Sequence, residues 1–256
     1  MTKGRRAASR AAKVARRPTS PDSPRDSLSF LDFVVFLVEC RFFKVPKYHF
    51  TQNSEAFASC FSLPQGDNVE GTNEENPFRL DGISKIDFKS LLKVMYPLDI
   101  PSNLSLATSE WVAVLKLSTL YCFVSARLLA IEKLTGIILD PIERVCLAKT
   151  YHVPKWFRSA LAELARRTQH ISLDDAEQLE FRTSILLYQV REEYIRAYGP
   201  SGSMGGYSYY NDTVDSSINR LFADNIRDLE RADAVYTQVP IGMEKFESEF
   251  SAVYEC

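Results

Sequence analysis

Residues 33–63 read FVVFLVECRFFKVPKYHFTQNSEAFASCFSL, and the fold class is decided within this stretch. The first six residues form an unbroken apolar run of aromatic and aliphatic side chains, which is typical of a strand buried on both faces. A short turn at 39–41 separates it from 42–45, the expected hairpin partner. From residue 48 the apolar residues recur at spacings of three and four, which predicts a helix over 48–63.

The rest of the chain extends this beginning into an α+β protein whose sheet lies early in the sequence. A polar loop is expected at 64–77, a short strand at 77–80, and a helix from Ser84 that ends before Pro97. The chain from 105 to 196 predicts consecutive helices. The pair Asp140-Pro141 is the strongest helix start among them, because an N-cap acceptor precedes a proline at the first helical position.

The sequence changes character again near residue 199. Four of the ten glycines fall within 199–206, which predicts a flexible linker over 199–213. Beyond it, apolar residues at helical spacing predict a last helix over 214–236.

The charge is concentrated at the start of the chain. Residues 1–27 hold eight Lys or Arg and two Asp, a net charge of +6, while the whole chain carries −2 and the remainder therefore −8. These residues hold almost no large apolar side chains and are expected to be a disordered tail. The tail could be a nuclear-import signal, a nucleic-acid contact, a mitochondrial transit segment or a functionless extension. The residues that would make import or phosphate contacts are Arg5, Arg6, Lys13, Arg16 and Arg17.

Three stretches together resemble the BTB/POZ family. The first stretch, which contains FVVFLVE, FFKVPKYHF and NSEAFASCF, is similar to the strand pair and first helix of that family. The second, IDFKSLLKVMYP, is similar to its F-x-x-L-L-x-x-x-Y segment. The third, WVAVLKLSTLYCFVSARLLAIEKL, is similar to its closing helical hairpin. The resemblance is greatest to a large set of fungal BTB/POZ proteins. It implies a small sheet with packed helices followed by a helical C-terminal extension. The chain then divides into a disordered basic tail (1–27), a BTB/POZ-like domain (28–135), a helical extension (136–198), a flexible linker (199–213), and a C-terminal helix and tail (214–256).

The resemblance also implies where partners would bind. Family members form homodimers or heterodimers through the N-terminal strand and first helix, so Leu28, Phe30, Leu31 and Phe33 are the expected dimer contacts. Four apolar residues within six positions also favour an interface independently of the family. Some members dock onto cullin-type ubiquitin-ligase scaffolds, and here Met95, Tyr96, Pro97 and Leu98 would make that contact.

Catalytic and metal-binding motifs are not found in the sequence. The three histidines stand in no metal-ligand spacing, and no Walker loop, G-x-S-x-G or G-x-G-x-x-G occurs. Ser90 and Lys93 match S-x-x-K, but Leu91 and Leu92 between them are better explained as core. We therefore expect no enzyme, no catalytic residue, no metal and no cofactor. The five cysteines show no C-x-x-C pair, and the first four are expected as small core residues.

The function expected from the sequence is protein association. The chain is interpreted as a dimeric adaptor for a cullin-type ubiquitin ligase, and alternatively as a nuclear transcriptional co-regulator whose basic N-terminal arm contacts nucleic acid. The longest apolar stretch is far short of the ~20 residues that span a bilayer, and no secretory signal is seen, so we expect the nucleus or the cytoplasm and no membrane contact.

Overall fold

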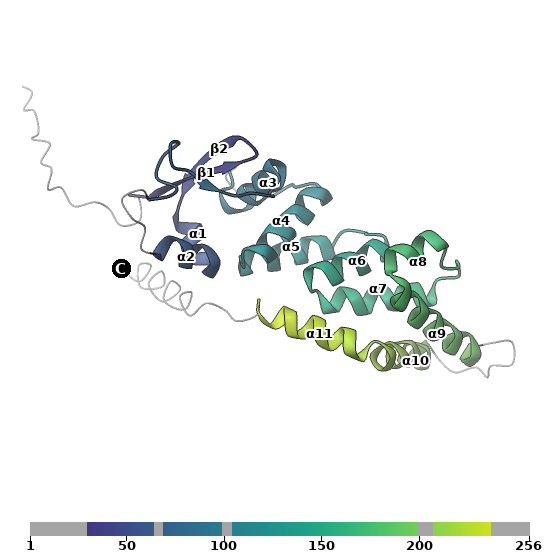
Figure 1. Ribbon diagram of the computed structural model, residues 1–256. Helices are drawn as coiled ribbons and strands as arrows, with labels where there is room; N and C mark the ends of the chain where they lie inside the picture. The colour runs from purple at the N-terminus through teal and green to yellow at the C-terminus, as the bar shows by residue number, and fades with distance from the viewer. Residues whose placement is uncertain (1–29, 64–68, 99–103, 199–206, 237–256) are drawn as a thin grey trace, which may run out of the picture.

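The computed structural model describes residues 30–63, 69–98, 104–198 and 207–236 (Figure 1). An early hairpin is followed by helices, which confirms the predicted α+β class. The elements are β1 Phe33–Val38, β2 Arg41–Pro46, α1 Tyr48–Asn53, α2 Glu55–Ser62, β3 Phe78–Arg79, α3 Lys85–Met95, α4 Thr108–Leu120, α5 Val124–Thr135, α6 Pro141–Tyr151, α7 Pro154–Arg166, α8 Leu173–Leu179, α9 Phe181–Tyr198, α10 Tyr207–Leu221 and α11 Ala223–Ala234.

The sheet has the strand order β2-β1-β3. β1 pairs antiparallel with β2 from Phe33 opposite Pro46 to Val38 opposite Arg41, and parallel with β3. Two residues, Glu39 and Cys40, make the hairpin turn with φ values of 43° and 60°. Positive φ at both positions is the geometry that matches the twist of a two-residue hairpin. The central strand is therefore β1, and β2 is an edge strand within the described residues.

Gly71 allows the loop after α2 to pass close to the sheet. Its carbonyl accepts a hydrogen bond from the N–H of Val35, and its φ is 81°. A Cβ at this position would lie 2.8 Å from Cγ2 of Val34. Any other residue would combine a left-handed backbone with a steric clash against β1.

An aromatic cluster forms the core beneath the hairpin. Its central members are Phe36, Phe50, Phe57, Phe88 and Phe123, and all are buried. The ring of Phe36 lies 4.8 Å from that of Phe50 and 5.4 Å from that of Phe88. The alternation of β1 explains the cluster, because Val34, Phe36 and Val38 share one face of the strand.

The predicted helix over 48–63 is two helices. Ser54 between them is extended, and its hydroxyl accepts a hydrogen bond from the N–H of Phe57 as the N-cap of α2. The same hydroxyl donates to the carbonyl of Tyr121, at 2.6 Å. Ser54 also forms an isolated bridge with Phe123. A partner far along the chain thus causes the break, which periodicity alone does not indicate.

Two other helices predicted as continuous are interrupted. The helix from Ser172 ends at Leu179, and Glu180, with φ 68°, turns the chain into α9. The helix predicted over 214–236 divides at Phe222, which is fully buried. Its first part, α10, begins at Tyr207, inside the range predicted as linker.

The prediction that the first four cysteines are core residues is wrong for Cys40 and Cys60, which are exposed. Cys40 lies in the hairpin turn, where a side chain points to solvent, and Cys60 lies on the outer side of α2. Cys122 and Cys146 are partly buried. The prediction that β1 is buried on both faces is wrong at its first residue, because Phe33 is 51% exposed.

The C-terminal helices return toward the first half of the chain. Figure 1 shows the sheet with α1–α5 at one end and α6–α9 at the other, while α10 and α11 run back along α7. The far end of α11 reaches α5, where Asp233 forms an ion pair with Arg127 at 2.7 Å. The C-terminal helix therefore contacts the hairpin-bearing half through side chains that lie far apart in the sequence.

Candidate protein-interaction surfaces

Exposed apolar side chains gather on the outer face of the hairpin. Phe33 and Phe42 are 51% and 46% exposed. They stand on the same face at opposite ends of the hairpin, because Phe42 lies opposite Leu37, four residues after Phe33 on β1. Phe30 and Leu31, just before β1, are 58% and 37% exposed. We call these four residues the N-terminal patch. The N–H of Lys47 donates to the carbonyl of Asp32, at 2.7 Å, and so holds the patch against β2.

The N-terminal patch contains three of the four residues predicted for dimer contacts. Leu28, the fourth, lies outside the described residues, as do Arg5, Arg6, Lys13, Arg16 and Arg17. The interpretation of Phe42 as a core residue beside Phe43 is wrong, because Phe42 is 46% exposed. The exposure of Phe42 follows from the alternation of β2, which places every second side chain on the outer face.

A groove lies on the other side of β2, between this strand and α3. Its volume is about 720 Å³, and its lining residues are Phe43, Val45, Pro46, Lys89, Leu92, Lys93, Tyr96, Pro97, Leu98, Leu104, Ser105 and Leu106. Apolar side chains predominate, and Lys89 and Lys93 are the charged members. We call this the β2–α3 groove.

The groove is held in shape at the end of α3 by Tyr96. Its hydroxyl donates a hydrogen bond to the carbonyl of Pro46. The ring of His49 lies 5.1 Å from that of Tyr96. Burial raises the pKa of Tyr96 and lowers the pKa of His49. At neutral pH the phenol is therefore protonated and able to donate, and the imidazole is neutral.

The predicted scaffold-docking residues divide between core and surface. Met95 is buried at 8% exposure, so its side chain is not offered to a partner. Tyr96 is half-buried, Pro97 is exposed and Leu98 is 96% exposed. The structure adds Leu104 and Leu106, which the sequence reasoning missed because they follow a loop and join the groove only in the fold.

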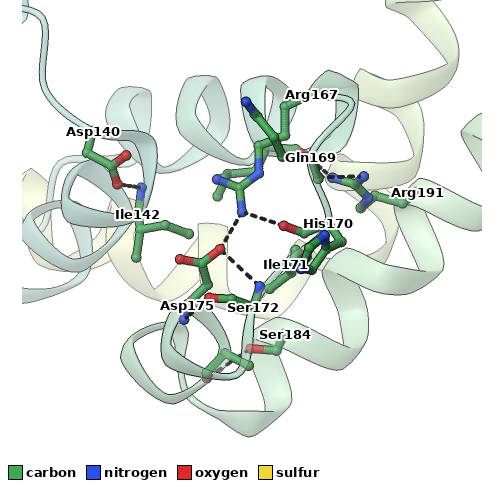
Figure 2. Close-up of polar contacts among 12 residues, drawn as sticks. Asp140, Ile142, Arg167, Gln169, His170, Ile171, Ser172, Asp175, Ser184 and Arg191 are labelled. Atoms are coloured by element: carbon green, nitrogen blue, oxygen red, sulfur yellow. Dashed lines mark hydrogen bonds and ion pairs between the residues drawn. The ribbon is translucent and has the colours of Figure 1, made fainter.

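A third cluster, at the α7–α8 connection, is polar and pairs mainly within itself, although Nε of Arg167 is buried without a hydrogen-bond partner among the described residues (Figure 2). Arg167 donates to the carboxylate of Asp175 at 2.5 Å, and Asp175 also accepts from the N–H of Ser172. Arg191 donates to the carbonyls of Leu164 and Gln169.

The electrostatics of this cluster agree with a structural role. Burial raises the pKa of Asp175, but hydrogen bonds from Ser172 and Arg167 outweigh it, so the pKa lies below its ordinary value. The carboxylate is thus ionised and already saturated by the chain. This cluster holds a connection in place and offers no group to a ligand.

The described ranges contain neither a metal-ligand cluster nor a membrane-spanning helix. Nowhere in them do three or more His, Cys, Asp or Glu side chains converge as metal ligands. None of the helices described is both long and apolar enough to cross a membrane.

Comparison with known proteins found no matching family model, no matching curated protein and no matching solved structure. The resemblance to the BTB/POZ family therefore rests on the sequence stretches quoted above and stays a prediction.

Proposed function

We propose that this chain is a BTB/POZ-like protein-interaction module that self-associates through the N-terminal patch and docks a second protein in the β2–α3 groove. By the family resemblance, that second protein is a cullin-type ubiquitin-ligase scaffold, and the chain is an adaptor and not an enzyme. We propose that the protein acts in the nucleus, in the cytoplasm or in both.

One observation supports the proposal most directly: the β1–β2 hairpin has apolar side chains on both of its faces. Phe33 and Phe42 are exposed on the outer face, and Phe43 and Val45 line the groove on the other. Contiguous exposed apolar side chains on a folded protein usually mark a binding surface. Lys89 lines the groove and favours a partner segment with acidic flanks, whereas Lys93 is already paired with Glu110 at 2.5 Å.

Light scattering of the full chain at micromolar concentration tests self-association. The wild-type chain is expected at the mass of a dimer, because a symmetric pair is the commonest way to cover such a patch. The Leu31→Asp variant is expected at the mass of a monomer. Ile138→Asp is the matched control, since Ile138 is 99% exposed and lies outside the patch. A wild-type monomer would end the dimer proposal.

Affinity purification of the full chain from cells tests scaffold docking separately. A cullin-type scaffold is expected to copurify with the wild-type chain and to be lost with Leu98→Asp. Leu173→Asp is the control, because Leu173 is 84% exposed on α8, away from the groove. If no scaffold copurifies while the dimer persists, the adaptor role is wrong and the module is a dimeric binder of another protein.

A second candidate is a nuclear co-regulator, and the charge distribution favours it. A net charge of +6 within residues 1–27 stands against −8 on the remainder, so attraction to nucleic acid would come from the tail. A DNA mobility shift that weakens with salt and disappears on deletion of residues 1–27 would support this reading. No shift at low salt would exclude it.

A further inference from the structure

Arg127 on α5 carries a buried guanidinium that forms an ion pair with α11. Its side chain is 1% exposed, and it donates to the carbonyls of Tyr151 and His152 at 2.9 and 2.8 Å, where α6 ends. Its carboxylate partner is Asp233 on α11, at 2.7 Å. The ring of Tyr236 lies 4.3 Å from the guanidinium carbon. A buried charge of this kind requires a carboxylate against it.

The residues by which α11 contacts the body follow one helical face. Ile226 and Leu229 are the buried residues of the helix, and Asp233 and Tyr236 continue the same line toward Arg127. These four positions are spaced by three, four and three residues, which places them on one side of a helix. The other face is charged, and its pairs Asp224–Arg227 and Asp228–Arg231 lie within the helix itself.

The surface on which α11 packs, which we call the seat of α11, is not completely filled. A cavity of about 230 Å³ lies between α11 and the α6–α7 pair, lined by Lys149, His152, Phe157, Asn225, Asp228, Leu229 and Ala232. Within the described residues, Nε of Arg127 and Nδ1 of His152 are buried without a hydrogen-bond partner. Packed protein interiors rarely leave such atoms unsatisfied. The seat thus has polar capacity that α11 does not use.

A second ion pair also joins α11 to α7, but it lies at the surface. Arg158 and Glu230 are 2.6 Å apart, with side chains 41% and 50% exposed. Exposed pairs are screened by water and contribute little. The position of α11 therefore depends mainly on its two apolar residues, on the buried ring of Phe222 where the helix begins, and on the buried charge of Arg127.

We propose that the surface formed by α5, α7 and the end of α6 is a docking site for an acidic amphipathic helix of a partner protein, and that α11 occupies it as a built-in competitor. The partner helix would carry the spacing that α11 displays: two apolar residues three apart, an Asp four residues later and an aromatic ring three after that. The Asp confers selectivity, because a helix without it would leave Arg127 buried and uncompensated. This site is independent of the N-terminal patch and of the β2–α3 groove.

The probe is a fluorescein-labelled peptide of residues 222–236, titrated into the full chain by fluorescence anisotropy. The Asp233→Asn variant weakens the built-in helix, and the peptide is expected to bind it about tenfold more tightly than the wild-type chain, because a larger fraction of the sites is open. A peptide carrying Asp233→Asn itself is expected not to bind.

Glu230→Gln is the matched control, because it removes an ion pair of the same helix at the exposed position. It is expected to bind the peptide as the wild-type chain does. Equal gains in both variants, or no gain with Asp233→Asn, would overturn the proposal.

Hydrogen exchange of the Asp233→Asn variant supplies a second measurement. Faster exchange is expected in 223–236, with α5 and α7 still protected. Faster exchange throughout α5–α7 would show that α11 is an integral part of the core, and would also overturn the proposal.

Discussion

Phe57 and Phe61 lie one turn apart on α2, but their side chains are buried to different extents. Both belong to the apolar residues whose spacing predicts a helix over 48–63. Phe57 is 2% exposed, with its ring 5.0 Å from that of Phe50 and 5.8 Å from that of Phe123. Phe61 is only partly buried, and Lys47 lies 4.4 Å from its ring centroid. Periodicity places both on one face but cannot show where the rim of the core falls.

The Phe57→Ala substitution is expected to lower the free energy of unfolding by about 3–5 kcal/mol, because it leaves a cavity among packed rings. Phe61→Ala is expected to cost clearly less, since part of its ring is already in water. Urea unfolding of the two variants against the wild type measures both. Equal losses would mean that Phe61 belongs to the core as fully as Phe57.

At the scale of elements, the start of α2 depends on one hydroxyl. Ser54 is 2% exposed, caps Phe57 and donates to the carbonyl of Tyr121. Ser54→Ala is expected to cost about 2 kcal/mol, because it removes a cap and leaves a buried carbonyl unpaired. Ser84→Ala is the matched control: Ser84 caps α3 through Ile86 alone, and about 1 kcal/mol is expected. Thermal or urea unfolding that ranks the two variants in the opposite order would contradict this assignment.

The α9–α10 contact is expected to weaken in acid. The carboxylate of Glu193 accepts hydrogen bonds from the Ser217 hydroxyl and from Arg220, and these bonds lower the pKa of Glu193. A lowered pKa in the folded state means that the stabilisation is present at neutral pH and is lost as the pH falls through that pKa.

Unfolding midpoints of the wild type and Glu193→Gln test this, measured at neutral pH and in acid below the lowered pKa of Glu193, which lies under the ordinary glutamate value of about 4.3. The two proteins are expected to differ at neutral pH and to converge in acid. Glu192→Gln is the control, because Glu192 pairs only with Arg196 among the contacts described for its carboxylate, and both side chains are mainly exposed. A difference between Glu193→Gln and the wild type that is unchanged in acid would argue against the assignment.

At the scale of the whole molecule, deletion of residues 1–27 is expected to leave the thermal midpoint unchanged. The reason lies in composition, since these residues carry charge and almost no large apolar side chains that could add to a core. Calorimetry of the full and shortened chains measures it. A clear fall in the midpoint would show that the segment packs on the folded body.

Across the whole molecule, sequence patterns predicted some helix boundaries and surface residues but not others. The start of α6 was predictable, because Asp140 caps it and Pro141 occupies the first helical position. The three breaks at Ser54, Glu180 and Phe222 were not, since each depends on contacts made elsewhere in the fold or on backbone geometry. Three of the four residues of the N-terminal patch were found from their density in the sequence.

The β2–α3 groove was predicted only in part. Tyr96, Pro97 and Leu98 were found through the family resemblance, whereas Leu104 and Leu106 join β2 through tertiary packing. The sequence did not distinguish Arg127 from Glu132 and Lys133, the other charged residues of α5, and its burial requires Asp233, a residue from the other end of the fold.

The outer edge of β2 limits how large an assembly this protein can form. The N–H of Lys47 points inward, to Asp32, so by alternation the N–H groups of Phe42 and Lys44 point outward, and Pro46, which should supply the next donor, has none. Lys44 would also face its own copy if identical strands stacked in register. The association proposed for this end would thus stop at a closed pair, because Lys44 and Pro46 disfavour open-ended stacking of β2. Joint replacement by Lys44→Val and Pro46→Thr is expected to convert concentrated samples into thioflavin-positive filaments, whereas the wild-type chain remains a discrete species.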